Sequence, residues 1–401
     1  MRITFSDSSV FLLDPALKSD GVFVADNFLS RDASVDLSKY AVFPGFVDVH
    51  VHFREPGFSY KETIATGSRA AAHGGYTTVC TMPNLNPVPD NLQNLRHQLD
   101  IINRDAVIEV IPFGSITKGE LGERLSDFED ISPFVCGFSD DGRGVDNAEL
   151  MKEAMTRAKK LGKVISAHCE DSAEAKDSPE AEYKQIERDI ALAKETGVAY
   201  HVCHISTEKS VELIRRAKAQ SVDISCETTP HYLLLSEDNV QNDGCFRMNP
   251  PLRSERDRRA MLEGIKDGTI DMIATDHAPH SAAEKSIGLH SLNGIVGLEC
   301  AFPMLYTELV LKNVITLERL IGLMALNPAK RFGIRQNGFC VYDLDCKYNI
   351  NAAEFESMGK CTPFDGKTVH GRCMATVSRG SLSYLDGSLS RKFGLHRPSG
   401  H

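Results

Sequence analysis

The stretch FPGFVDVHVHFREPG, residues 43–57, decides the fold. Its first half is apolar and rich in valine, which is typical of a buried strand. His50 and His52 are two residues apart, so on a strand both side chains face the same side. A Pro-Gly pair then marks a turn. The pattern predicts a buried strand that carries two imidazoles at its carboxyl end.

Seven further apolar runs follow, and amphipathic helical patterns lie between most of them. The eight predicted strands span residues 42–53, 76–83, 107–116, 134–141, 164–170, 199–206, 222–231 and 270–280. The clearest helix covers 147–162, with Gly162 as its stop signal. Eight strand–helix units predict an α/β fold, a closed parallel (β/α)8 barrel of the TIM type, which needs ~250 residues. A doubly wound open sheet is the alternative, but no Gly-x-Gly-x-x-Gly motif follows the first strand.

The segments outside these units have a different character. Residues 1–41 and 336–401 contain short β-prone pieces and turns with few helical patterns. We expect them to pair into one small β domain formed from the N- and C-terminal segments, with the barrel over residues 42–335 between them.

Composition narrows the function classes. The formal net charge of −10 over 401 residues argues against a general nucleic-acid binder, which needs a basic face. The eleven cysteines include no Cys-x-x-Cys pair, so we interpret them as reduced, mostly buried thiols of a cytoplasmic protein. The first residues lack a signal-peptide pattern, and no run approaches the about 18 apolar residues of a membrane helix. We therefore expect no membrane contact.

Residues with metal-binding side chains gather at the carboxyl ends of the predicted strands, where barrel enzymes carry their active sites. Besides His50 and His52, these ends offer Asp140, Asp141, His168, His204, Asp276, His277 and His280. Four imidazoles and two carboxylates suit two metal ions that share a bridging carboxylate and a bridging hydroxide, and such a hydroxide is a nucleophile at neutral pH. The alternative is that each is an isolated polar loop residue, which does not explain why every one lies at the same end of a strand.

The other histidines have a plainer interpretation. His201 is out of phase with His204 in the alternation of a strand, so we expect His201 to face the helices. His231 ends the seventh run and is either support for the pocket or plain packing. Five others are predicted to be surface or turn residues: His73, His97, His370, His396 and His401.

At these positions the chain resembles the dihydroorotases, specifically the bacterial type close to hydantoinases and allantoinases. The matching stretches are FPGFVDVHVHFREPG, KETIATGSRAAAHGGYTTVCTMPN, AHCED, HVCHIST, TTPHYL, MNPPLR, ATDHAPH and TPFDGKTVHG. The resemblance covers nearly the whole barrel. Three departures are a short segment between His168 and His204, a short N-terminal β segment and a poorly kept stretch around 336–345.

The resemblance implies two zinc ions per subunit. It implies as ligands His50, His52, Asp141, His168, His204 and Asp276. Many amidohydrolases bridge their metals with a carboxylated lysine, but here the fourth strand ends in Asp-Asp without a lysine. We choose Asp141 over Asp140 as the bridge because it lies 27 residues before His168, the spacing of the family.

The resemblance also implies a reaction, the reversible cyclisation of N-carbamoyl-L-aspartate to L-dihydroorotate in de novo pyrimidine (UMP) biosynthesis. The bridging hydroxide would attack the ring amide, with Asp276 as catalytic base and then acid. Arg54, Asn84 and His280 would hold the substrate carboxylate, and Asn249 the ring or ureido amide. A guanidinium can grip a carboxylate by two hydrogen bonds, although a surface salt bridge between Arg54 and Glu55 is the alternative.

Further expectations and alternatives follow from the same resemblance. We expect a homodimer and consider a carbamoyltransferase partner. A hydantoinase or allantoinase would share the metal ligands but would not need Arg54. A catalytically silent homologue that serves as a scaffold is the third hypothesis, and loss of a ligand would favour it.

Overall fold

The computed structural model describes residues 2–4, 22–24, 34–36, 40–336 and 338–393. Each of the eight predicted runs contains a barrel strand, and every neighbouring pair in the ring is parallel. The strands are β5 (Phe46–Val51), β6 (Tyr76–Thr81), β7 (Glu109–Pro112) continued by β8 (Gly114–Ser115), β9 (Gly137–Ser139), β10 (Val164–Ala167), β11 (Tyr200–Val202), β12 (Ile224–Thr228) and β13 (Met272–Ile273). The backbone N–H of His52 donates to the carbonyl of His277 over 2.8 Å, which joins the last strand to the first. The prediction of a (β/α)8 barrel is confirmed.

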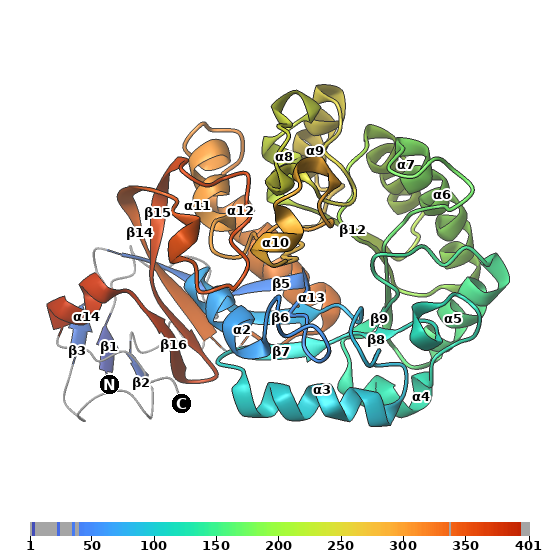
Figure 1. Cartoon of the computed structure of the whole chain (residues 1–401), viewed down its shortest axis with the longest axis horizontal. Coiled ribbons are helices and arrows are strands. Elements are labelled where there is room, and N and C mark those ends of the chain that lie inside the picture. The colour runs from blue at the N-terminus through green and yellow to red at the C-terminus, as the bar shows by residue number, and fades with distance from the viewer. Residues whose placement is uncertain (1, 5–21, 25–33, 37–39, 337, 394–401) are drawn as a thin grey trace.

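Helices surround the strands (Figure 1). The main ones are α2 (Ile64–His73), α3 (Leu92–Asp105), α4 (Phe128–Ile131), α5 (Ala148–Lys160), α6 (Pro179–Thr196), α7 (Glu208–Ala219), α8 (Pro230–Leu234), α9 (Glu255–Asp267), α10 (Ala282–Lys285), α11 (Ala301–Leu305), α12 (Leu317–Ile321) and α13 (Asn327–Phe332). Short single turns are η2 (Lys118–Glu120), η3 (Ser132–Phe134), η4 (Glu237–Asn239), η5 (Gly244–Phe246), η6 (Gly288–His290) and η9 (Ala352–Glu354), and wider turns are η7 (Tyr306–Val310) and η8 (Gly322–Leu326). None of the helices in the described ranges combines the length and apolar character that crossing a membrane requires.

The helix predicted at 147–162 shows how local sequence sets an element. The side chain of Asn147 accepts from the backbone N–H groups of Glu149 and Leu150 at the start of α5, which satisfies donors that the helix itself cannot. Met151, Ala154 and Ala158 are buried on one face. Gly162 follows at φ 65°, a left-handed conformation that glycine adopts without a Cβ penalty.

A four-stranded antiparallel sheet with the order β16-β15-β14-β4 lies beside the barrel, on the left of Figure 1. Its strands are β4 (Ala41–Pro44), β14 (Gly338–Asn349), β15 (Thr368–Ser378) and β16 (Ser381–Leu385), and α14 (Gly387–Phe393) follows. Three further strands form a separate sheet: β1 (Arg2–Thr4), β2 (Val22–Val24) and β3 (Ser34–Asp36). Pairing of β4 with β14 joins chain before the barrel to chain after it.

The first predicted strand, 42–53, is therefore wrong as one element, because β4 belongs to the antiparallel sheet and only β5 belongs to the barrel. Gly45 separates the two, and a Cβ on it would lie 2.1 Å from the Thr77 side chain. The domain limits at 41 and 335 stay predictions. Phe43 and Phe46, on either side of this glycine, pack around Phe302 with ring centroids 5.6 and 5.2 Å away, which fixes the sheet against the barrel.

An apolar cluster fills the inside of the barrel. It draws apolar side chains from strands around the ring, among them Val47, Val49, Cys80, Cys203 and Met272. A register shift between Asp48 and Val51 interrupts the pairing of β5 with β6, and a bulge of this kind inverts which residues point inward. Val47 and Val49 consequently lie in the interior cluster, whereas Val51 packs in the outer core.

Candidate metal and substrate site

The carboxyl ends of the strands surround a cavity of about 240 Å³. Its lining includes most of the residues that the sequence predicts for the site: His52, Arg54, Asn84, Asp141, His168, His204, Asn249, Asp276 and His280. His50 is not part of the cavity lining and is fully buried beside these residues. All ten predicted site residues therefore come together at one mouth, and their roles stay predictions.

His50 and His52 both turn their Nε2 atoms toward the same two carboxylates. His50 Nε2 lies 3.2 Å from Asp141 Oδ1 and 3.6 Å from Asp276 Oδ1. His52 Nε2 lies 3.1 Å from Asp276 Oδ1 and 3.4 Å from Asp141 Oδ2. Asp141 thus faces both imidazoles of the first strand.

Asp141 also faces the second pair of imidazoles. Its Oδ1 lies 3.6 Å from His204 Nε2 and 3.9 Å from His168 Nδ1, and these two nitrogens are 3.0 Å apart. Burial raises the pKa of the Asp141 carboxyl, but the charge of His50 and the close approach of the other imidazoles hold this pKa well below its ordinary value. A carboxylate between two histidine pairs is the arrangement that a bridging ligand requires.

The neighbouring Asp140 points elsewhere. Its carboxylate accepts from the backbone N–H groups of Ile116 and Thr117 at 2.7 and 3.0 Å, and from the Thr117 hydroxyl. These contacts hold Asp140 outside the cluster, and Asp141 is the aspartate that faces the imidazoles.

The donor set fits metal ions. His50, His52 and His168 each donate from their other ring nitrogen, to Glu227 (2.6 Å), Asn84 (2.9 Å) and Glu170 (3.1 Å). This leaves the lone pair of the inward nitrogen free for a ligand bond. Within the described part of the chain, His50 Nε2 and Asp141 Oδ1 are buried without any hydrogen-bond partner, which a metal ion would satisfy. The groups His50–His52–Asp276 and His50–Asp141–His204 each have ligand atoms within 4.8 Å of one another.

Arg54 and His280, two of the predicted carboxylate contacts, line the same cavity. Arg54 Nε donates to the carbonyl of Pro279 over 3.3 Å, and its Nη2 lies 3.4 Å from His280 Nε2. Burial lowers the pKa of the guanidinium, but the nearby Asp276 and Asp141 oppose this effect. Glu55, which the alternative pairs with Arg54, instead accepts from the backbone N–H of Ile64 over 2.9 Å.

The two asparagines contact the predicted metal ligands directly. Asn84 accepts from His52, and its amide nitrogen lies 3.5 Å from the carbonyl of Asp141. Asn249 donates to Glu170 over 3.0 Å, and Glu170 in turn holds His168. Both amides therefore connect the cavity wall to the histidine cluster.

Three of the eight non-glycine residues with positive φ in the described ranges lie in this site. Arg54 (φ 57°), His204 (φ 31°) and Asp276 (φ 49°) all adopt the left-handed conformation without being glycine. Such strain costs of order 1–3 kcal/mol per residue and is common where function fixes a side chain.

Two carboxylates that the sequence does not single out support the cluster: Glu227 is fully buried and Glu170 is partly buried. Glu227, near the carboxyl end of β12, accepts from His50 with one carboxylate oxygen and from His201 Nε2 (3.0 Å) with the other. Glu170 holds His168 and Asn249. Position at a strand end was an available signal for Glu170, which closes the fifth run, whereas Glu227 lies inside the seventh run and has no such signal.

The expectation that His201 faces the helices is wrong. Tyr200 faces them, because its hydroxyl donates to Asp189 on α6 over 2.8 Å, so the next residue on β11 points inward. His201 contacts Phe332 and Glu227 inside the barrel. His204 lies beyond the end of β11, so its direction does not set the alternation of side chains along the strand.

The remaining histidines lie outside the cluster. His277 closes the barrel: its Nδ1 accepts from the Gly297 N–H and its Nε2 lies 3.6 Å from Glu62. His231 is buried in the first turn of α8, and its Nε2 makes no hydrogen bond within the described ranges. His97 is exposed, whereas His73 and His370 are partly buried. His396 and His401 lie outside the described residues.

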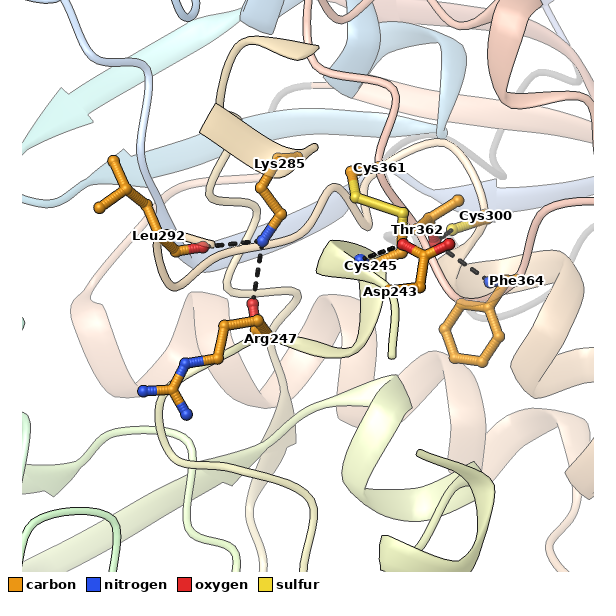
Figure 2. Close-up of a disulfide and its surroundings, with 9 residues drawn as sticks. All are labelled: Asp243, Cys245, Arg247, Lys285, Leu292, Cys300, Cys361, Thr362 and Phe364. Carbon is orange, nitrogen blue, oxygen red and sulfur yellow. Dashed lines mark hydrogen bonds between the residues drawn. A yellow bond between two sulfur atoms is a disulfide. The ribbon is translucent and has the colours of Figure 1, made fainter. Parts of the chain in front are cut away.

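The prediction that all cysteines are reduced is wrong for one pair. Cys245 and Cys361 form a disulfide with a Cα–Cα distance of 4.9 Å (Figure 2), although 116 residues separate them, so no sequence spacing reveals it. The nine other cysteines are free, and only Cys346 among them is not buried.

The region of this disulfide adjoins the cavity wall. Figure 2 shows Lys285 donating to the carbonyls of Arg247 and Leu292, over 3.1 and 2.8 Å. Arg247 lies two residues before Asn249, and Leu292 lines the cavity. The buried Lys285 therefore ties together two segments that build the wall.

A parallel barrel with a small β sheet and a mouth of imidazoles and carboxylates defines the class of cyclic amidohydrolases. Structural comparison agrees. An L-hydantoinase (dihydropyrimidinase) from Arthrobacter aurescens has a TM-score of 0.80 at 26% identity, covering 90% of this chain and 89% of that one. A D-hydantoinase has a TM-score of 0.80 at 21% identity, covering 97% and 96%, which shows the shared fold alone.

Sequence comparison is more specific. A family model described as dihydro-orotase-like matches residues 40–180. A dihydroorotase of Fusobacterium nucleatum is 48% identical over 391 residues, covering 90% of this chain and 92% of the relative. A dihydroorotase of Staphylococcus aureus is 44% identical over 378 residues, covering 87% and 89%. The chain belongs to the dihydroorotase family.

Proposed function

We propose that this chain catalyses the reversible cyclisation of N-carbamoyl-L-aspartate to L-dihydroorotate in pyrimidine biosynthesis. The observation that carries the proposal is the position of Arg54, whose guanidinium stands in the cavity wall beside His280 and within the same cavity as the histidine cluster. A substrate carboxylate needs such a cation, because burying an unpaired carboxylate is costly. The dihydroorotases among the relatives support the same substrate.

We also propose that the cluster holds two zinc ions. His50, His52 and Asp276 would hold one, His168 and His204 the other, and Asp141 lies between both groups. Bound zinc would supply a water of lowered pKa and a Lewis acid for the ring carbonyl. No lysine lines the cavity among the described residues, which supports an aspartate rather than a carboxylated lysine as the bridge.

The side chains themselves have distinct tasks. Although burial raises the pKa of Asp276, its contact with His52 and the nearby imidazoles lower it to about 2, so the group is ionised and can accept a proton. In ring opening Asp276 takes the proton of the attacking water and passes it to the leaving amide nitrogen. Arg54, Asn84 and His280 orient the carboxylate, while Asn249 stands where it can contact the amide, so the reacting groups meet in one geometry.

The family resemblance supports a homodimer, with a carbamoyltransferase as a candidate partner, and membership of a family of pyrimidine biosynthesis supports a cytoplasmic location. Sedimentation of the purified protein would test the first, and a pull-down with purified carbamoyltransferase the second. A monomer at all concentrations, or no capture, would contradict them.

The decisive experiment compares substrates. Zinc-loaded protein is assayed side by side on L-dihydroorotate, hydantoin and allantoin. Turnover should be confined to dihydroorotate, with N-carbamoyl-L-aspartate as the product. Preferred turnover of hydantoin or allantoin would show a different amidohydrolase, and no turnover of any of the three would favour a silent homologue.

A further inference from the structure

Lys61 contacts His280, one of the predicted carboxylate contacts, and has no role in the proposed mechanism. Lys61 Nζ lies 3.2 Å from His280 Nδ1 and 3.0 Å from Glu284 Oε1. The side chain is 11% exposed. It does not line the cavity itself, so any effect on substrate must pass through His280.

The contact between Lys61 and His280 fixes the proton on the imidazole. A lysine ammonium has three donors and no acceptor, so His280 Nδ1 must accept. Burial, together with the charges of Arg54 and Lys61, lowers the pKa of His280 to about 3, and the ring is therefore neutral. The one remaining ring proton of His280 must then be on Nε2.

That Nε2 proton is directed toward the carboxylate wall. His280 Nε2–H donates to the carbonyl of Asn293 over 2.7 Å, and the Arg54 Nη2 donor lies 3.4 Å from the same nitrogen. Two donors cannot bond each other, so they converge on a shared acceptor position. A carboxylate is a stronger acceptor than a neutral carbonyl, and it can take over the donor that Asn293 now receives.

Lys61 is itself held in place. Glu284 accepts from Lys61 and from the hydroxyl of Tyr60, and its other oxygen accepts from the N–H and hydroxyl of Ser281 at 3.0 Å. The ammonium also lies 5.8 and 5.5 Å from the ring centroids of Phe58 and Tyr60, within reach of a cation–π contact. The orientation of Lys61 therefore exists before any substrate arrives.

We propose that Lys61 is a positioning residue for substrate specificity: it holds His280 in the Nε2–H tautomer, so that His280 and Arg54 present two donors to one substrate carboxylate. This inference rests on the proposed function for the identity of the substrate. It assigns Lys61 no contact with the reacting atoms.

Steady-state kinetics test the proposal. In zinc-loaded Lys61→Met protein, KM for L-dihydroorotate should rise roughly 10-fold with kcat little changed, as expected when one charge-assisted hydrogen bond of uniform binding is lost. Lys61→Arg keeps a donor-only cation and should restore most of the affinity. The matched control is Lys218→Met, a partly buried lysine paired with Asp271 outside the mouth, which should leave KM unchanged. An unchanged KM in Lys61→Met, or a fall confined to kcat, would overturn the proposal.

A second measurement does not depend on turnover. Histidine ring ¹⁵N spectra of the zinc-loaded protein, with the His280 signal assigned from His280→Gln, report which nitrogen carries the proton. The wild type should show the Nε2–H tautomer, and Lys61→Met should shift toward Nδ1–H. A wild-type Nδ1–H tautomer, or identical spectra for His280 in both proteins, would refute the role of Lys61 even if dihydroorotate is turned over. If the wild type fails on dihydroorotate but shows the expected spectra, the proposed function is wrong and the positioning of His280 stands.

Discussion

At their carboxyl ends the barrel strands carry buried imidazoles and carboxylates, whereas a few residues earlier the strands carry apolar side chains. His50, Asp141 and His204 represent the first region, and Val49 and Met272 the second. At the mouth, His204 has a left-handed backbone, and His50 and Asp141 have buried polar atoms without hydrogen-bond partners. Val49 and Met272 in the interior have neither feature. The difference indicates that the interior stabilises the fold and that the mouth gives up stability for binding.

The largest effect is expected from removing both histidines of the first strand. His50→Ala/His52→Ala protein should lose bound zinc and fall to background activity, because two of the inward nitrogens are gone. Elemental analysis measures the zinc content, and thermal unfolding checks that the barrel remains folded. His97→Ala, which removes an exposed histidine, serves as control. Unchanged zinc in the double variant would disprove the site.

The next largest effect concerns proton transfer. Asp276→Asn should lower kcat by ~10²–10⁴-fold in both reaction directions, which is the usual contribution of a general acid or base. Zinc content is measured in the same samples, so that loss of proton transfer is separated from loss of metal. Near-normal turnover with zinc bound would contradict the role of Asp276.

Arg54 separates carboxylate recognition from ring binding. Arg54→Met should lower kcat/KM for dihydroorotate by ~10²–10³-fold, since it removes one partner of a buried charged pair, while the zinc stays bound. Any activity on an uncharged cyclic imide should change far less. The control Arg104→Met removes an exposed arginine that pairs with Asp105. If Arg54→Met turns over dihydroorotate normally, the arginine is not a substrate contact.

Glu227 tests whether the support beneath the cluster matters as well as the ligands. Glu227→Gln should weaken zinc binding by ~10–100-fold, because a neutral amide orients His50 less strongly. Competition with a chelator measures the affinity. Glu299→Gln changes another buried glutamate that accepts from a histidine, His73 at 2.6 Å, and should leave zinc affinity intact. Equal affinities for all three proteins would show that Glu227 does not act through His50.

The smallest effect on catalysis is expected inside the barrel. Met272→Ala should leave kcat unchanged while lowering the free energy of unfolding by ~2–5 kcal/mol, because it opens a cavity in the apolar cluster. Denaturant unfolding of the zinc-loaded protein measures the stability. A large loss of kcat at unchanged stability would remove the distinction between the two regions.

The sequence predicts the metal-binding side chains at the mouth better than the buried residues that hold them in place. The strand-end rule placed His50, His168 and His204 together because every parallel strand of a barrel ends on the same side. The same rule did not select Glu227, because a glutamate inside an apolar run has no partner visible in the sequence. His201 was assigned to the wrong face, since one residue of error in strand phase reverses a side chain.

The sequence by itself determined the barrel, the family and the group of residues at the mouth, because hydrophobic periodicity and short motifs are local properties. The tertiary structure alone decided which nitrogens face the cluster, that β4 leaves the barrel for the antiparallel sheet, and that Cys245 meets Cys361 across 116 residues. It also decided that Lys61 stands behind His280, 219 residues away. Contacts of this kind depend on how distant segments pack, and no periodicity within one segment encodes them.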